Sequence, residues 1–96
     1  MVAEGRIRLD KWLWQARFFK TRGLSVSQVE AGHVRINGEK TRKPGHGLAP
    51  GDVVTFLQGD LVRVVRVLDI GTRRGPASEA QGLYRDEGGQ TPAALE

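Results

Sequence analysis

The stretch RIRLDKWLWQARFFKTRGLSVSQVEAGHVRINGEKTRK, residues 6–43, decides the fold. Its first two thirds have the residue spacing of two helices, and its last third alternates like a hairpin. The positive charge is concentrated here: residues 1–43 hold ten Lys or Arg against four acids, whereas residues 44–96 hold five against seven. The whole 96-residue chain carries a net charge of +4. A small basic domain of this kind is expected to bind a polyanion, and nucleic acid is the first candidate.

The first helix is predicted from apolar residues at helical spacing, and we expect it to end near Phe19 or Lys20. At about 100° per residue, one stripe forms the expected core face. That stripe contains Leu9, Trp12, Leu13, Ala16 and Phe19. The remaining surface is cationic and aromatic, with Arg8, Lys11, Trp14, Gln15 and Phe18.

A second helix is predicted over residues 22–31. Thr21 is its expected N-cap, because the threonine hydroxyl can accept a hydrogen bond from a free backbone N–H. Leu24 and Val29 are its expected inward residues. Gly32 is the expected terminator, since glycine tolerates the left-handed conformation after the last turn.

Beyond the second helix the sequence has the pattern of a small antiparallel sheet. Residues 34–36 alternate, Asn37-Gly38 predicts a type I′ hairpin turn, and residues 39–41 form the return strand. A loop at 44–47 and a type II turn at Pro50-Gly51 precede predicted strands at 53–57 and 61–68. The fold class is therefore α+β: an alpha-L arrangement of two helices packed on a small antiparallel sheet.

The last part of the chain is expected to be an extension of this domain. Residues 76–84 predict a short C-terminal helix that begins with a proline in its first turn. Residues 86–96 contain glycines and a proline and are expected to be disordered. The expected organisation is a domain at 6–70, an extension at 71–85 and a tail at 86–96.

Catalytic and metal-binding functions have little support in the sequence. The chain has no cysteine, which excludes disulfides and thiolate ligands. His33 and His46 have no carboxylate pair at metal-ligand spacing, and no glycine loop precedes a helix to bind phosphate. We therefore expect no enzyme, no metal and no cofactor.

No segment approaches the ~18 apolar residues of a membrane helix, and no signal peptide is recognisable. A cytoplasmic monomer is expected.

The candidate RNA-binding residues are the cations of the helix pair, of the hairpin and of the loop after it. They are Arg8, Lys11, Arg17, Lys20, Arg22, Arg35, Lys40, Arg42 and Lys43. Arginines outnumber lysines eleven to four in the chain, which favours bidentate contacts with phosphates or base edges. If the helices pack against the hairpin, several of these cations share one face.

Trp14 and Phe18 allow two interpretations. As exposed aromatics beside Lys11 they could stack on unpaired bases. Alternatively, the short C-terminal helix around Leu83 and Tyr84 covers them and makes them part of the core. We favour coverage, because soluble monomers rarely leave large apolar patches exposed.

Three motifs resemble a known family. They are Arg8-Leu9-Asp10-Lys11-Trp12-Leu13, Lys20-Thr21-Arg22 and Gly32-His33-Val34-Arg35-Ile36-Asn37-Gly38. This pattern is similar to the S4 RNA-binding domain, or alpha-L motif. Within that family, the chain resembles the bacterial ribosome-associated heat-shock protein 15 subfamily. The segments shared with that subfamily are Trp12-Leu13-Trp14, residues 16–22, Arg73-Arg74, residues 76–80 and Leu83-Tyr84.

The resemblance implies a stress-response protein that binds ribosomal RNA of the large subunit. Its expected role is rescue or recycling of stalled subunits that carry a nascent chain on tRNA. By position, the resemblance places seven of the candidate cations against RNA, from Arg8 to Lys40. The subfamily often has a basic residue where this chain has Val26, and its members continue into a basic tail beyond the position of Glu96.

Two other functions stay open. One is a regulator that binds messenger or transfer RNA away from the ribosome. The other is a protein-interaction module that docks a partner through the Trp14/Phe18 patch. Binding through that patch is expected to survive high salt.

Overall fold

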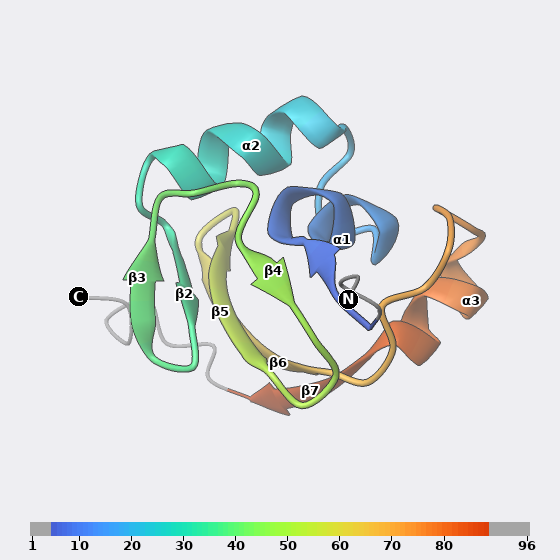
Figure 1. Ribbon diagram of the computed structural model, residues 1–96. Helices are drawn as coiled ribbons and strands as arrows, with labels where there is room; N and C mark the ends of the chain where they lie inside the picture. Colours follow the sequence, from blue (N-terminus) through green and yellow to red (C-terminus); the bar gives the residue numbers. More distant parts are fainter. Residues whose placement is uncertain (1–4, 89–96) are drawn as a thin grey trace.

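The computed structural model describes residues 5–88 (Figure 1). The chain forms three α-helices, one short 3-10 helix and seven strands within these residues, which confirms the α+β class. In chain order they are β1 (Ile7–Arg8), α1 (Leu9–Gln15), α2 (Arg22–Glu30), β2 (Val34–Ile36), β3 (Glu39–Thr41), β4 (Gly47–Leu48), β5 (Val53–Gln58), β6 (Leu61–Val67), α3 (Ala77–Ala80), η1 (Gln81–Leu83) and β7 (Tyr84–Gly88).

Five strands form one antiparallel sheet in the order β3-β2-β5-β6-β7, and β1 pairs separately with β4. The predicted hairpin is confirmed: Val34 pairs with Thr41 and Ile36 with Glu39. Asn37 and Gly38 have φ angles of 53° and 87°, as a type I′ turn requires. The β5–β6 hairpin matches its predicted range to within one residue at each end. Helices α1 and α2 lie together on one side of the curved sheet (Figure 1).

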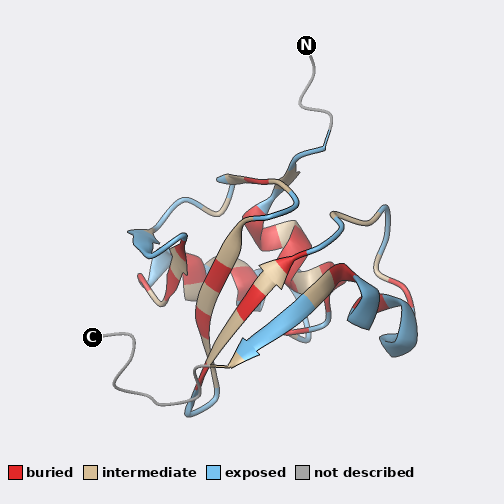
Figure 2. Ribbon diagram, turned by 90° about the horizontal axis from the view of Figure 1, so that it is seen from below, coloured by how far each residue is buried: buried red, intermediate tan, exposed pale blue. Residues whose placement is uncertain are grey.

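The core lies between the helix pair and the sheet. Trp12 and Leu13 of α1 are fully buried, as is Val29 of α2. Along β2 and β5 the buried residues alternate with more accessible ones, and Figure 2 shows this alternation as bands along the strands. The alternation lets one face of each strand contact the helices while the other faces outward.

Helix α1 ends four residues earlier than predicted. Ala16 is the C-cap and Arg17 has a left-handed φ of 67°, so the chain turns before Phe18. The N–H of Phe18 donates to the carbonyl of Leu13, and that of Arg17 donates to Trp14, which is the Schellman pattern. The turn directs Phe18 into the core, where it is 6% exposed, while Phe19 is only partly buried. The sequence analysis extended the helical spacing past Gln15. It therefore placed Phe19 on the core face and Phe18 away from it, whereas Phe18 is the more deeply buried of the two rings.

Helix α2 begins where predicted and ends one residue before the predicted limit. The Thr21 hydroxyl accepts a hydrogen bond from the backbone N–H of Leu24 at 3.1 Å, which confirms the N-cap. Gly32, with φ 82°, follows the last turn as expected. The prediction for Leu24 is wrong, because its side chain is 47% exposed and the buried residues of α2 are Ser25 and Val29.

The C-terminal extension is tied to the end of α1. Four side chains donate to backbone carbonyls across this junction: Trp12 to Asp69, Gln15 to Ile70, Arg17 to Gly75 and Arg74 to Trp14. The predicted short helix is present as α3 and η1, but Tyr84 already belongs to β7. Strand β7 pairs with β6, so the prediction of disorder from Asp86 is wrong for residues 86–88. Residues 89–96 of that predicted tail lie outside the described residues.

Candidate nucleic-acid interface

Asp10 joins two of the candidate cations from different helices. Its carboxylate is 2% exposed and accepts a hydrogen bond from Arg8 Nε at 3.0 Å and from Arg22 Nε at 3.2 Å. Arg8 precedes α1 and Arg22 begins α2, so the pair also links the starts of the two helices. Arg8 also donates to this carboxylate through Nη2 at 3.5 Å. Both arginines stay about half exposed, so part of each guanidinium group faces solvent. We call Arg8, Asp10 and Arg22 the Asp10 cluster.

The two arginines determine the ionisation of Asp10. Burial alone raises the pKa of this carboxyl, but hydrogen bonds and positive charge from Arg8 and Arg22 outweigh it. The net pKa lies below the ordinary value of 3.8. Asp10 is thus a carboxylate under all but strongly acidic conditions, and it keeps the two arginines in place.

The loop at residues 42–46 packs beside this cluster. The N–H groups of Leu9 and Asp10 donate to the carbonyls of His46 and Pro44, so the loop caps the start of α1. The Arg8 guanidinium lies over Gly45, where a Cβ would come within 3.4 Å of it. Arg42 and Lys43, both exposed, belong to the same loop. Arg8, Arg22, Arg42 and Lys43 therefore border the seam between the helix pair and this loop, and we call them the basic cluster.

Glycine at position 32 keeps Arg42 close to the end of α2. A Cβ there would lie 3.0 Å from two guanidinium nitrogens of Arg42, closer than an ordinary contact. The backbone at Gly32 also has a positive φ that other residues rarely adopt. The same glycine that ends α2 therefore makes room for a cation of the basic cluster.

The other candidate cations lie at four separate places. Arg35 and Lys40 are directly paired across the β2–β3 hairpin, on the face opposite to the buried Val34 and Ile36. Lys11 is half-buried on α1, and Lys20 is exposed before α2. Arg17 stands at the far end of α1, where its Nε donates to the carbonyl of Gly75 at 2.7 Å. The nine cations thus form a basic cluster with flanking groups and not one compact patch.

Charge pairing separates the two halves of the chain. Four arginines after residue 60 have ion pairs with Asp or Glu: Arg63, Arg66, Arg73 and Arg85. In the first half, by contrast, Asp10 is the one acid within residues 5–43 that pairs with a cation. Seven cations of the first half have no ion-pair partner within residues 5–88, namely Arg6, Lys11, Arg17, Lys20, Lys40, Arg42 and Lys43. The excess positive charge of the first half therefore remains available to a polyanion.

Arg6 is a cation of this region that the sequence analysis left out. A shallow hollow of about 240 Å³ is lined by Arg6, Ile7, Arg8, Gly45 and Gly47. Arg6 and Arg8 flank Ile7 in an extended segment, and β1 pairs with β4 there. Alternation in Arg6-Ile7-Arg8 is the strand signal that could have identified Arg6, but two residues are too few to predict a strand.

Of the two interpretations of Trp14 and Phe18, the structure supports coverage. Phe18 packs against Phe56 and Tyr84 with ring centroids 4.7 and 4.6 Å away. Trp14 is partly buried, and the Arg74 guanidinium lies 5.6 Å from its ring centroid. Both rings are thus covered by the C-terminal extension, as favoured, although Arg74 and not the short helix covers Trp14.

The described residues contain neither a metal-binding cluster nor a helix that could span a membrane. Within residues 5–88, no group of three His, Cys, Asp or Glu side chains is placed to hold a metal ion. None of the helices in the same range has the length and hydrophobicity needed to span a bilayer.

Comparison with known proteins identifies the family. The S4 domain model matches residues 7–54, the range that contains α1, α2, the hairpin and the loop at 42–46. The chain belongs to the S4 domain family. The S4 domain is an RNA-binding domain. All four residues of the basic cluster lie within the matched range. The family match and the distribution of positive charge therefore indicate the same surface.

Similar proteins place the chain near one group within the family. It is 46% identical to the heat shock protein 15 homolog of Aeromonas salmonicida over 84% of its length, and 45% identical to heat shock protein 15 of Escherichia coli K12 over 83%. These matches cover 61% and 59% of the relatives, so the chain spans about three fifths of their length. The solved structure of Vibrio cholerae heat shock protein 15, described as trimeric, superposes with a TM-score of 0.80 at 43% identity, covering 84% of this chain and 81% of that one. The chain is a homologue of heat shock protein 15, which confirms the resemblance.

The Asp10 cluster makes stability depend on acid in a defined direction. Because the folded-state pKa of Asp10 is lowered, its contribution is complete above the unfolded value near 3.8 and is lost as pH falls through the folded value. Asp10→Asn should lower the free energy of unfolding by about 1–3 kcal/mol at neutral pH, and the difference from wild type should disappear toward pH 2. Urea titrations across this range measure it. A constant difference at every pH would contradict the role assigned to the carboxylate.

Proposed function

We propose that the protein binds ribosomal RNA of the large subunit and acts in rescue or recycling of stalled subunits that carry nascent chain–tRNA. The observation that carries RNA binding is the basic cluster: exposed cations, held by Asp10 and the 42–46 loop, next to cations without ion-pair partners. The similarity to heat shock protein 15 supports the choice of the ribosome. Transfer RNA on the stalled subunit is a second RNA within reach of such a protein.

RNA shape is the expected basis of selectivity. Phosphate contacts position a protein without reading sequence, and double-stranded RNA is recognised mainly through backbone and shape. The basic cluster offers guanidinium and ammonium groups, which suit phosphates, while Arg35 and Lys40 add a second cationic pair on the hairpin. We propose that the helix pair follows the RNA backbone and that the hairpin contacts an adjacent strand.

Affinity should depend steeply on salt. If about five phosphates are neutralised, the logarithm of the association constant falls against log salt with a slope of roughly −3.5 to −4.5. A filter-binding titration of the protein with ribosomal RNA over a range of potassium concentrations measures the slope. A slope near zero would mean that the unpaired cations do not contact phosphate.

Crosslinking in cells, followed by sequencing of the bound RNA, tests the proposed target. Enrichment of large-subunit ribosomal RNA, and its increase when translation is interrupted, supports the proposal. Enrichment of messenger RNA or free transfer RNA instead would assign the protein to the regulators that act away from the ribosome. The protein-interaction alternative has lost its basis, because Phe18 is buried and Trp14 is covered.

We also propose that the protein acts in the cytoplasm as a monomer. The V. cholerae relative is described as a trimer, so the oligomeric state needs its own measurement. Light scattering coupled to gel filtration at low micromolar concentration distinguishes the 10.6 kDa monomer from a trimer.

A further inference from the structure

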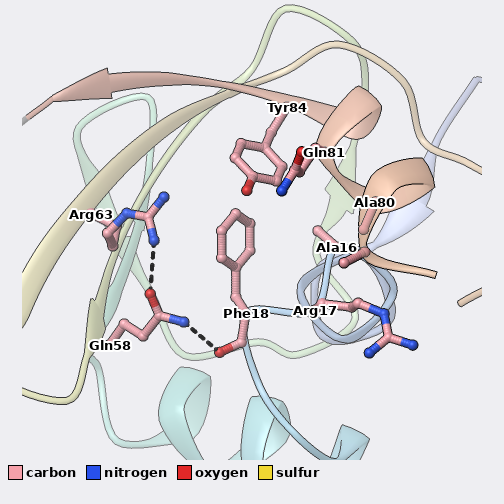
Figure 3. A pocket seen from close by; sticks show the side chains of 9 residues that line it. Ala16, Arg17, Phe18, Gln58, Arg63, Ala80, Gln81 and Tyr84 are labelled. Atoms are coloured by element: carbon pink, nitrogen blue, oxygen red, sulfur yellow. Dashed lines mark hydrogen bonds between the residues drawn. The ribbon is translucent and has the colours of Figure 1, made fainter. Parts of the chain in front are cut away.

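A second candidate binding site lies where the C-terminal extension meets the S4 domain. A cavity of about 200 Å³ opens between the end of α1, the β5–β6 hairpin and the α3–β7 segment. In Figure 3 the rings of Phe18 and Tyr84 face each other at its centre, with Gln81 beside Tyr84 and Arg63 at the opposite wall. We call this cavity the junction pocket. It is distinct from the basic cluster, which borders the start of α1.

The polar groups of the junction pocket keep hydrogen-bonding capacity. The Tyr84 hydroxyl and the Gln81 amide have no hydrogen-bond partner within residues 5–88. Arg63 donates through Nη1 to Gln58 at 2.8 Å and through Nη2 to Asp86 at 3.2 Å. Tyr84 and Gln81 can each donate and accept hydrogen bonds, and they do not hydrogen-bond to each other. Both groups are therefore available to a ligand in the cavity.

Flat surfaces form the rest of the lining. The ring centroids of Phe18 and Tyr84 are 4.6 Å apart with planes inclined by 53°. The Arg63 guanidinium carbon lies 5.3 Å from the Phe18 centroid. Aromatic rings and guanidinium planes are the surfaces on which proteins stack unpaired bases, and hydrogen bonds to the base edges accompany the stacking.

Charge and size decide between a base and a phosphate. The positive charge of Arg63 is compensated by Asp86, and Figure 3 shows the Arg17 guanidinium directed away from the two rings. An anion thus meets little net positive charge in the pocket. The cavity is also smaller than the ~300–1,000 Å³ of typical small-molecule sites, so it takes a group no larger than a single base.

Arg17, one of the candidate RNA-binding cations, is part of the lining of the junction pocket. It borders the pocket, is exposed, and has a left-handed φ of 67° in a position where glycine is usual. Its hydrogen bond to the Gly75 carbonyl fixes the extension to this turn. A strained arginine at the rim of a cavity is the kind of backbone outlier that accompanies binding sites.

We propose that the junction pocket binds one unpaired nucleobase of the RNA whose backbone lies on the basic cluster. The base packs against Tyr84 and the Arg63 guanidinium, and its edge hydrogen-bonds to Gln81 and the Tyr84 hydroxyl. This inference rests on the proposed RNA binding. It adds a contact that recognises a flipped or single-stranded nucleotide, whereas the basic cluster recognises phosphate.

The test compares base contacts with phosphate contacts in the whole protein. The probe is a fluorescein-labelled RNA hairpin with a short single-stranded uridine extension, together with copies in which each extension base in turn is replaced by an abasic site. The variant combines Tyr84→Phe with Gln81→Ala, which keeps the aromatic ring and removes two hydrogen-bonding groups. Thr72→Ala, an exposed position of the same extension outside the pocket, is the control. Thermal melting shows that all three proteins are folded.

Wild type should lose about five- to tenfold in affinity for one abasic position and little for the others. The double variant should bind the intact RNA about five- to tenfold more weakly, show no further loss at that abasic position, and keep the wild-type salt slope. Equal affinity of the variant and the control, or equal abasic losses in both, overturns the pocket but leaves the basic cluster intact. Failure of wild type to bind any of the RNAs overturns the proposed function and the pocket together.

Discussion

Reversal of the charges in the 42–46 loop, Arg42→Glu with Lys43→Glu, should weaken RNA binding by about a hundredfold at 0.1 M salt. Both side chains are exposed and neither has an ion-pair partner within residues 5–88, so the change breaks no ion pair of the folded protein. The melting temperature should stay within a few degrees of wild type. Filter binding with ribosomal RNA and a thermal scan measure the two quantities.

A control with the same change in net charge shows whether position matters. Arg73→Glu with Arg85→Glu alters two arginines that already pair with Glu79 and Glu87 and are largely exposed. Exposed pairs of this kind contribute little to stability. Affinity should fall by less than about threefold. If both double variants weaken binding equally, the RNA responds only to total charge and the basic cluster has no special role.

Trp12→Ala should destabilise the protein by about 3–5 kcal/mol, which is a large share of the ~5–15 kcal/mol of a typical domain. The indole is fully buried, and its Nε1 donates to the carbonyl of Asp69 at 3.0 Å, so the change leaves a cavity and an unpaired carbonyl. The melting temperature should drop by about 20 °C. Urea unfolding followed by circular dichroism gives the free energy directly.

The neighbouring tryptophan is the matched control. Trp14 is partly exposed and is covered by Arg74, so Trp14→Ala should cost about 1 kcal/mol and leave RNA affinity unchanged. Equal destabilisation by the two changes would contradict the assignment of Trp12 to the core and Trp14 to its edge. A loss of RNA affinity in Trp14→Ala without destabilisation would restore the stacking interpretation.

Local signals in the sequence predicted much of the fold. The Asn37-Gly38 turn, the Thr21 cap and Gly32 each impose a backbone conformation through one or two residues, and each element they define is where it was expected. Strand alternation likewise placed β5 and β6. These features depend on neighbours in sequence, so they can be identified without knowledge of the tertiary structure.

The errors share a different physical cause. Helix α1 ends at Gln15 because Arg17 adopts a left-handed conformation that is stabilised by Gly75, 58 residues away. Strand β7 forms because β6 offers an edge, although the sequence of residues 84–88 has little strand character. Long-range contacts of this type override local propensity and have no signature in a short window.

The candidate site was predicted in composition but not in arrangement. That the nine cations bind RNA stays a prediction. Nothing in the sequence indicated that Asp10 would join Arg8 to Arg22, or that Arg42 would pack on Gly32. A lone acid in a basic segment is expected only to lower its charge. In the structure Asp10 instead orients the guanidinium groups of Arg8 and Arg22, because its buried carboxylate binds the Nε atom of each.

Chemical-shift mapping of the labelled protein against a ribosomal RNA hairpin tests the central claim most directly. That claim is that the positive charge of the first half, centred on the basic cluster, forms the RNA-binding surface. The largest shifts should fall on Arg8, Arg22 and the 42–46 loop, with smaller ones on Arg35 and Lys40 and none on Arg73 or Arg85. Shifts centred on the paired arginines of the second half, with the basic cluster unaffected, would contradict the account.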